Sequence, residues 1–423
     1  MTLQPVANPH DQELERLLRQ DTHLIRKVQS YQRQGRNEKA RKARKHYLRS
    51  VASKAKAIRD VVKKDRLDWD ADQIVTYANQ ISLRATPSDC INIKHVRKPN
   101  GGTRPIHTYT PLGKAKQTVV ANLLKQCNEI PSHAYDVQGR GVHALIRDVK
   151  QRHNEGAKFI GVLDIKNFFG SLNCAAMSTI LRIPRTVCED ILTIPFAGRS
   201  LNSYIQEGRR SNRSIGSGTI NRPPTQSPIG YSGLPQGSAA SPIVATLLLG
   251  DLGHLVPEGV ELLAYRDDLI IVARRQLEVR TAISSLEGFL RDHPAGPLEL
   301  GYRSTHQISQ GVSFLGHHFK SKAGKLKVIP AGKGVRGFRP KLVECILTDI
   351  HNGTPPTKSL NYIRSWLAQY GECTNCDYLQ EVFIADCDFM HELADAEMRQ
   401  HTPKSEIRRR LSQYPIGRIQ QYG

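Results

Sequence analysis

Two short apolar runs around three polar residues constrain the fold of this chain more than any other feature. Residues 262–265 and 269–273 have the length and apolar content of paired β-strands, and between them stand Arg266, Asp267 and Asp268. This layout predicts a β-hairpin that carries acids at its tip.

A third apolar run ends in another acid. Residues 159–163 are predicted to form a buried strand, and Asp164 follows directly. If this strand neighbours the hairpin in one sheet, Asp164, Asp267 and Asp268 converge. Hard Mg²⁺ ions prefer oxygen ligands, and two ions roughly 4 Å apart can stabilise the attacking and leaving oxygens of an in-line phosphoryl transfer. The pattern predicts a site for two Mg²⁺ ions, which Mn²⁺ could replace, although an Asp-Asp pair at a turn is by itself more often solvated.

The chain carries a large positive charge. Its 423 residues include 61 Lys and Arg against 39 Asp and Glu, which gives a net charge of +22. Such a surplus favours a polyanionic partner, with nucleic acid as the leading candidate, over the alternative of a merely basic soluble protein. A single hydrophobic core rarely grows beyond about 250–300 residues, so the length predicts two or three subdomains.

The N-terminal region is predicted to be helical and basic. Apolar residues recur at spacings near three and four from Gln12 to about Arg66. The second half is rich in cations: Arg36, Lys39, Arg41, Lys42, Arg44, Lys45, Arg49, Lys54, Lys56 and Arg59. We expect a positive stripe on one helix face that binds phosphates, with Lys42, Arg44 and Lys45 as nucleic-acid contacts. The alternative is an ordinary solvated face.

The remaining sequence predicts strands, helices and one long loop. Residues 91–108 are predicted to form a hairpin with its turn at 99–102. Residues 199–232 lack a hydrophobic period and are predicted to be a loop. Predicted helices cover residues 112–127, 143–152, 243–249 and the region from Pro340 onward.

Nothing in the sequence predicts export or a membrane span. The first eight residues contain no apolar core behind a basic stretch, and no run of about 18 apolar residues occurs, so we expect a cytoplasmic protein. The eight scattered cysteines do not resemble a disulfide framework. Cys373, Cys376, Cys387 and His391 have a spacing that suits zinc, but the residues between them resemble a packed helix, so buried thiols are expected instead.

Three segments resemble the motifs of a known family. Residues 163–169 (LDIKNFF) are similar to motif A of reverse transcriptases, residues 233–238 (GLPQGS) with the following Ser-Pro to motif B, and residues 265–268 (YRDD) to motif C. Residues 98–104 resemble the fingers hairpin, and residues 314–316 resemble the primer grip. The resemblance covers roughly residues 90–320 and is closest to the prokaryotic enzymes of retrons, group II introns and antiphage defence.

The resemblance implies roles at the metal ions and at the nucleotide. The implied metal ligands are Asp164, Ile165, Asp267 and Asp268, of which Asp268 would support the site from its edge. The three aspartates are the implied catalytic residues.

Five residues are implied to bind the incoming nucleotide. Lys98 and Arg104 would hold the triphosphate, since Arg suits bidentate phosphate contact. Gln236 and Gly237 would pass close to template and nucleotide, where a side chain at Gly237 would obstruct approach. Phe169 would lie under the sugar and exclude a 2′-hydroxyl, which favours deoxynucleotides and disfavours an RNA polymerase; the phenylalanine before it is better explained as core.

Nucleic-acid contacts are implied for four further residues. Tyr265 is expected either to contact nucleic acid or to pack the hairpin. Arg266 is expected either to reach the primer backbone or to balance the nearby acids. Leu315 and Gly316 correspond to the primer grip.

One segment departs from the family pattern. Group II intron-type enzymes carry a proton-donating Lys before the primer grip, whereas residues 300–306 are LGYRSTH. Arg303 stays charged and is a poor proton donor. His306 is left either as the donor or as an ordinary surface histidine.

Together these features predict an α+β right-hand polymerase with fingers, a palm that contains an antiparallel sheet, and a helical thumb. The expected parts are a basic helical N-terminal extension at 1–84, fingers at 85–160, a palm at 161–319 and a thumb-like helical region at 320–423.

The predicted activity is RNA-directed DNA synthesis in bacterial antiphage defence with a partner noncoding RNA. The alternatives are a mobile-element enzyme of the group II type and a non-catalytic RNA-binding protein on a polymerase fold, which the intact acids disfavour. The expected partners are an RNA template, a DNA primer or product, and dNTPs, with no membrane; a protein partner or a homo-oligomer is left open. Few residues follow His391, so no RNase H or HNH domain is expected.

Overall fold

The computed structural model of the chain describes residues 9–86, 89–97, 103–137, 139–193, 233–374, 376–400 and 402–413. Lys98, the predicted turn at 99–102 and the predicted loop at 199–232 lie outside the described residues. Within the described part, no helix has the length and apolar content needed to cross a membrane.

The chain divides into two compact units that are each discontinuous in sequence. Unit 1 consists of Met1–Ala134, Asp164–Leu255 and Ser285–Tyr302, and unit 2 of Tyr135–Leu163, Val256–Ser284 and Arg303–Gly423. The predicted division into four parts at residues 84, 160 and 319 stays a prediction.

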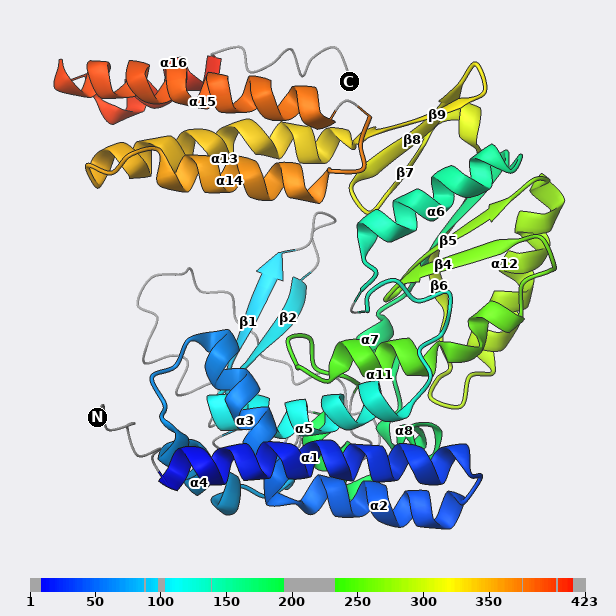
Figure 1. Cartoon of the computed structure of the whole chain (residues 1–423). Helices are drawn as coiled ribbons and strands as arrows, with labels where there is room; N and C mark the ends of the chain where they lie inside the picture. The colour runs from blue at the N-terminus through cyan, green and yellow to red at the C-terminus, as the bar shows by residue number, and fades with distance from the viewer. Residues whose placement is uncertain are drawn as a thin grey trace, which may run out of the picture. The chain divides into compact units, whose positions relative to one another are not determined.

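Unit 1 begins with a group of helices (Figure 1). They are α1 (Pro9–Arg33), α2 (Asn37–Arg49), α3 (Val51–Asp65) and α4 (Ala71–Gln80). The prediction that this region is helical is confirmed, but the helix is interrupted twice. Gly35, at a φ of +66°, lies in the turn between α1 and α2. Ser50 follows α2 and caps α3 by accepting a hydrogen bond from the N–H of Ser53 at 3.1 Å.

Helix α5 (Pro111–Cys127) is the central helix of unit 1. Thr110 caps it by accepting a hydrogen bond from the N–H of Gly113 at 3.0 Å, and a proline occupies its first turn. It packs against α1, α2, α3 and α11 (Ser241–Leu248). Its fully buried side chains include Ala115, Val119, Val120, Leu123 and Leu124. The helices predicted at 112–127 and 243–249 are therefore confirmed.

Unit 1 also contains a hairpin and several short helices. Strands β1 (Cys90–Arg97) and β2 (Thr103–Tyr109) pair antiparallel, as predicted for residues 91–108. The short helices are α7 (Phe168–Ser171), α8 (Cys174–Leu181), α9 (Arg185–Val187), the π-helical η1 (Cys188–Leu192) and the 3₁₀-helical η2 (Gly250–His254).

The predicted apolar runs form one sheet. Its strands are β3 (Phe159–Ile165), β4 (Glu261–Tyr265), β5 (Asp268–Ala273) and β6 (Leu300–Gln307), in the order β4-β5-β3-β6. The helices of this region are α6 (Val142–Asn154), which confirms the prediction at 143–152, and α12 (Gln276–Arg291). A Cβ at Gly161 of β3 would lie 2.7 Å from Cγ1 of Val279 in α12, so the glycine allows this helix to approach the strand closely.

Unit 2 ends in a second sheet followed by helices. Strands β7 (Val312–Phe314), β8 (His317–Lys322) and β9 (Lys325–Pro330) pair antiparallel in sequence order, with η3 (Ile308–Gln310) before them. The helices are α13 (Gly332–His351), α14 (Thr357–Gln369), α15 (Cys376–Arg399) and α16 (Lys404–Gln413). The prediction of a helical region from Pro340 onward is confirmed.

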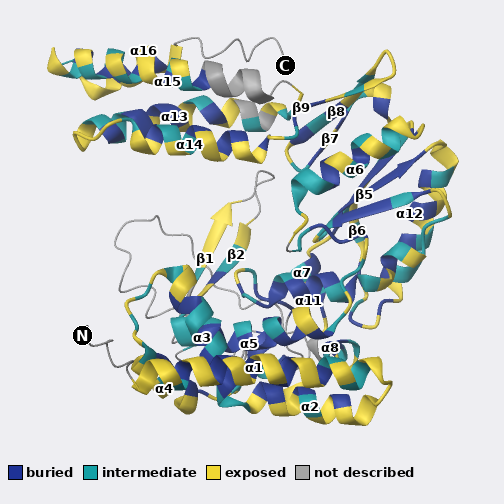
Figure 2. Cartoon of the chain, viewed as in Figure 1, coloured by how far each residue is buried: buried dark blue, intermediate teal, exposed yellow. Residues whose placement is uncertain are grey.

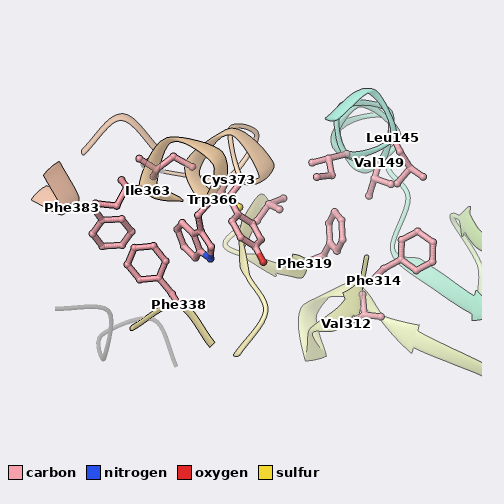
Figure 3. Close-up of a cluster of buried hydrophobic side chains, with 14 of the residues drawn as sticks. Leu145, Val149, Val312, Phe314, Phe319, Phe338, Ile363, Trp366, Cys373 and Phe383 are labelled. Atoms are coloured by element: carbon pink, nitrogen blue, oxygen red, sulfur yellow. The ribbon is translucent and has the colours of Figure 1, made fainter. Parts of the chain in front are cut away.

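Aromatic side chains fill the core of these C-terminal helices (Figure 3). The ring centroid of Phe338 lies 4.7 Å from that of Trp366 and 4.9 Å from that of Phe383. Cys373 and Cys387 are buried in the same core, and burial raises the pKa of the Cys387 thiol to about 11. The side chain of Cys376 is not among the described ones, so the expectation that this cluster binds no zinc stays a prediction.

Candidate catalytic site

The tip of the β4–β5 hairpin carries two of the predicted acids. Tyr265 and Asp268 face each other as the last strand pair, which leaves Arg266 and Asp267 as the whole turn. Arg266 has a φ of +61°, and the tight turns that match strand twist require such positive values. Both aspartates are half-buried. The predicted hairpin with acids at its tip is confirmed.

Strand β3 carries the third acid near its C-terminal end. The N–H of Lys158 donates to the carbonyl of Ala273 at 3.0 Å, and Gly161 lies beside Ile271. The start of β3 therefore neighbours the end of β5, and the two strands run antiparallel. Asp164 is the penultimate residue of β3 and the first residue of a segment of unit 1, whereas Asp267 and Asp268 belong to unit 2. Asp164 is half-buried between two buried apolar neighbours.

No protein-only metal cage is found in the described chain. Among the described residues, no group of three or more His, Cys, Asp and Glu side chains is arranged to hold a metal ion. Mg²⁺ commonly binds one or two carboxylates and completes its octahedral shell with water and substrate phosphates. Convergence of Asp164 with Asp267 and Asp268 at one metal site therefore stays a prediction.

Arg266 and Tyr265 both have partners inside unit 2. Arg266 Nε lies 3.8 Å from Oδ2 of Asp136, and its guanidinium lies over the ring of Tyr265, with Cζ 5.7 Å from the centroid. Tyr265 is partly buried and packs against the core of unit 2. For Tyr265, the structure supports the predicted alternative that it packs the hairpin. For Arg266, it supports the alternative that it balances a nearby acid. Contacts of either residue with nucleic acid stay predictions.

In unit 1, the segment after β3 is fixed to the motif B turn. The N–H of Leu234 donates to the carbonyl of Phe169 at 2.7 Å. Gly233 has a φ of +49°, and a Cβ there would lie only 2.2 Å from the same carbonyl oxygen. Phe168 is buried, as predicted, whereas Phe169 is half-buried with its ring edge-on to Phe168 at a centroid distance of 5.5 Å.

The motif B turn is also fixed to the β1–β2 hairpin. The N–H of His107 in β2 donates to the carbonyl of Gln236 at 2.7 Å. Gly237 has a φ of +107°, and a Cβ there would lie 2.3 Å from the carbonyl oxygen of His107. The neighbour that requires glycine here is therefore protein backbone, and approach of template or nucleotide to Gly237 stays a prediction. His107 is buried, which lowers the pKa of its imidazole.

His107 and Gln117 are site-supporting residues that the sequence did not indicate. Gln117, buried in α5, accepts a hydrogen bond from the N–H of Ala239 through its Oε1 at 3.0 Å. Both contacts join segments more than a hundred residues apart, so no local pattern could have revealed them. Arg104, the predicted triphosphate ligand, is exposed on β2 opposite Val96. Its predicted companion Lys98 lies outside the described residues.

The predicted primer-grip residues form the turn between β7 and β8. Phe314 pairs with His317, so Leu315 and Gly316 are the complete turn, with φ values of +46° and +79°. Two positive φ values are the requirement of a type I′ turn. Leu315 packs against the core of unit 2, and its carbonyl lies 3.0 Å from Nδ1 of the buried His317. Burial lowers the pKa of His317.

The segment that departs from the family pattern lies on β6. Arg303 is exposed. His306 is half-buried, and its Nε2 lies 2.8 Å from Oγ of Ser304. A role for His306 as a proton donor stays a prediction.

The predicted basic stripe needs one correction. Arg44 is only 2% exposed and donates hydrogen bonds to the carbonyls of Leu181 at 3.1 Å and Cys127 at 2.8 Å. Arg44 therefore connects α2 to other parts of unit 1. Its predicted role as a phosphate contact is wrong. Lys54 is buried as well, which lowers its pKa. Lys42 and Lys45 are exposed, and their role as nucleic-acid contacts stays a prediction.

Comparison with known proteins identifies one family. Residues 96–319 match the family described as reverse transcriptase (RNA-dependent DNA polymerase), which is more than half of the 423 residues. The matched region includes the acids of β3 and of the β4–β5 hairpin, the motif B turn and the turn between β7 and β8. No curated protein matches the chain in sequence.

Several solved telomerase structures are distantly similar. The telomerase of Candida tropicalis truncated from its C-terminal domain is 14% identical, with a TM-score of 0.34, over 56% of this chain and 54% of that one. The Candida albicans telomerase in complex with a TWJ fragment of telomeric RNA is 13% identical, with a TM-score of 0.36, over 79% and 66%. The apo telomerase of Candida tropicalis is 12% identical, with a TM-score of 0.39, over 78% and 62%. The matches thus span between 54% and 66% of those structures. Similarities with TM-scores this low support no conclusion about this chain.

The family match agrees with the observed elements. An antiparallel sheet carries the acids, and helices and smaller sheets make up the rest, so the α+β right-hand polymerase fold predicted from the sequence is confirmed. The chain therefore belongs to the reverse transcriptase family.

Proposed function

We propose that the chain is an active, Mg²⁺-dependent RNA-directed DNA polymerase in which Asp164 and Asp267 hold the metal ions. The observation that carries the proposal is the β4–β5 hairpin, whose two-residue turn presents Asp267 with Asp268 beside it. Asp164 corresponds to the motif A acid and is half-buried near the end of β3. Asp268 begins β5 and supports the site from its edge, and Ile165 completes the proposed ligand set. Divalent metal ions are general to the family, and Mg²⁺, with Mn²⁺ as a substitute, is the choice we propose.

The donor set suits hard divalent cations. Carboxylate oxygens are the ligands that Mg²⁺ prefers, and the half-buried aspartates keep access to substrate phosphates and water. When bound, two ions would polarise the attacking hydroxyl and neutralise the charge on the leaving oxygen. The protein's part is to hold the carboxylates rigidly, and the hairpin turn and the buried neighbours of Asp164 provide that rigidity.

Other residues are proposed to hold the nucleotide. Arg104, exposed on β2, would bind the triphosphate together with Lys98. The hydrogen bond between His107 and Gln236 would keep the hairpin and the motif B turn in register. Phe169 would lie under the sugar, and its backbone is held by motif B through Leu234.

Phe169→Val is expected to reduce discrimination between deoxynucleotides and ribonucleotides while DNA synthesis continues. The smaller side chain leaves space for a 2′-hydroxyl, whereas the metal ligands are unchanged. The ratio of kcat/KM for dNTP and the matching rNTP measures the effect. A ratio equal to that of the wild type would contradict the role of Phe169 and leave the polymerase proposal intact.

The proposed RNA-binding surface lies on the first two helices and the turn between them. Figure 2 shows exposed residues along the outer faces of α1 and α2. Exposed cations without an ion-pair partner among the described residues are Arg19, Arg26, Lys27, Arg33, Arg36, Lys39, Lys45 and Arg49. Unpaired Lys and Arg side chains release counterions on binding phosphates, which favours RNA association.

Neutralising Lys42 and Lys45 is expected to weaken RNA binding in a salt-dependent way. The slope of log affinity against log salt concentration should become shallower by about 0.7–0.9 for each phosphate that the protein no longer neutralises. Arg44→Ala is the matched control from the same helix. It should leave this slope unchanged and instead lower the free energy of unfolding by about 2–3 kcal/mol, because buried carbonyl groups lose their donor. A shallower slope for Arg44→Ala alone would contradict this assignment.

We further propose that the enzyme acts in the cytoplasm in bacterial antiphage defence with a partner noncoding RNA. The support is the resemblance of its motifs to prokaryotic reverse transcriptases and the exposed cations of α1 and α2. Sequencing the nucleic acid that co-purifies with the chain tests it. One dominant noncoding RNA, with complementary DNA made from it, is the expected result. Intron RNA would favour the mobile-element alternative, and a mixture without complementary DNA would favour a non-catalytic RNA-binding protein.

A further inference from the structure

We propose that Arg266 is a positioning residue whose ion pair with the buried Asp136 fixes the turn that presents Asp267. The inference rests on the proposed polymerase function, because it assigns the residue that orients a proposed metal ligand. The residues that carry it, from Tyr135 and Asp136 to the β4–β5 turn, belong to unit 2.

The turn between β4 and β5 holds Arg266 in a backbone conformation that arginine disfavours. Only Arg266 and Asp267 connect the last paired residues, and the φ of Arg266 is +61°. A Cβ is crowded by backbone in this region, so glycine or asparagine is the usual occupant. Strained backbone near a functional group persists only where the surroundings compensate for it. The contacts of the arginine side chain supply that compensation here.

Asp136 provides the first of these contacts. Its side chain is only 3% exposed, and its Oδ2 lies 3.8 Å from Nε of Arg266, whose side chain is 48% exposed. A buried carboxylate has lost its hydration and requires a cation nearby. The guanidinium also lies over the ring of Tyr265, within cation–π distance. Arg266 is therefore engaged on two sides by its own unit.

The segment that carries Asp136 is itself fixed. The N–H of Tyr135 donates to the carbonyl of Ala264 in β4 at 2.8 Å, and the carbonyl of Tyr135 accepts from the N–H of Gly141 at 2.7 Å. The hydroxyl of Tyr135 donates to the carboxylate of Asp148 in α6. Asp136 is thus attached to the strand that leads into the turn. Its ion pair with Arg266 braces the turn against that strand.

The competing role for Arg266 is a direct contact with primer phosphates. Such a contact depends on Arg266 alone and makes primer affinity sensitive to salt. A brace instead acts on the position of the metal-binding carboxylate, and residues that orient metal ligands typically contribute 10–100-fold to metal affinity or activity. Only the brace requires Asp136, so the two roles predict different behaviour for an Asp136 variant.

The test uses Arg266→Gly and Asp136→Asn in the full chain, separately and together. Glycine suits the positive φ, and asparagine keeps the shape of the buried side chain, so both variants should fold. The matched control is Arg275→Ala, because Arg275 is an exposed arginine of the same unit that is paired with Glu278. The Mg²⁺ concentration that gives half-maximal primer extension should rise about tenfold in each single variant and no further in the double variant. The KM for the primer–template should be unchanged. Mn²⁺ affinity, measured by EPR without catalysis, should fall by a similar factor.

Three outcomes would contradict either the brace formed by Arg266 and Asp136 or the polymerase proposal. A raised KM for the primer in Arg266→Gly, with wild-type behaviour of Asp136→Asn, would replace the brace with a phosphate contact. Unchanged Mg²⁺ and Mn²⁺ dependence in both single variants would also overturn it. If the wild-type chain extends no primer but both variants bind Mn²⁺ more weakly, the polymerase proposal fails and the brace stands.

Discussion

Replacing Asp164 or Asp267 with Asn is expected to slow deoxynucleotide addition about a thousandfold. The substitution removes one negative charge and keeps nearly the same shape, so the metal-bound transition state loses several kcal/mol. A loss of about 4 kcal/mol corresponds to roughly a thousandfold at 1.36 kcal/mol per factor of ten. Single-turnover extension of a primed RNA template with dNTPs and Mg²⁺ measures the effect. Asp268→Asn should lose less, because this residue supports the site from its edge.

The control for the aspartate variants is Asp292→Asn. The side chain of Asp292 is 75% exposed and pairs only with the neighbouring Arg291 in the described chain, so its loss should leave extension unchanged. Melting temperature and RNA affinity should be equal in the wild type and all four variants. If Asp164→Asn and Asp267→Asn stay within a few-fold of the wild type, these residues are not the metal ligands.

The second large effect is expected for Gly237→Ala. A Cβ at this position would lie 2.3 Å from the carbonyl oxygen of His107, so the motif B turn or strand β2 must move by about an ångström. Displacement of that size at a substrate-positioning element can cost on the order of a hundredfold in rate. We expect this loss in kcat/KM for dNTP, with RNA affinity retained.

A second glycine separates collision from backbone strain. Gly324, between β8 and β9, has a φ of +75°, and a Cβ there would meet nothing within 4 Å. Gly324→Ala therefore introduces an unfavourable positive φ without the collision, and polymerase activity should stay near that of the wild type. Equal losses in the two variants would show that the contact with His107 has no special importance.

The sequence predicted the elements whose signals are local. The apolar runs at 159–163, 262–265 and 269–273 became strands because five or so consecutive apolar residues bury well in a sheet. The position of the hairpin tip could be predicted from the three polar residues Arg266, Asp267 and Asp268 between two apolar runs. The acids could be assigned to one site because the motifs occur in the order of a known family. Phe168 was predicted as core and is buried.

The errors and omissions arose where distant contacts decide the role of a residue. Arg44 belongs to a basic run, yet its guanidinium is buried against carbonyls from residues 127 and 181, and charge counting cannot distinguish such an arginine from an exposed one. His107 and Gln236 are also far apart in sequence, and their contact is a backbone hydrogen bond that no side-chain pattern encodes. Arg266 and Asp136, which form a side-chain ion pair, are likewise far apart in sequence.

Extension of a primed RNA template by wild-type chain and by Asp267→Asn, purified and assayed side by side with dNTPs and Mg²⁺, decides whether the chain is itself a polymerase. The wild type is expected to make DNA complementary to the template, and the variant is expected to make roughly a thousandfold less at equal folding and equal RNA affinity. Equal extension by the two proteins would contradict the assignment of catalysis to the β4–β5 hairpin.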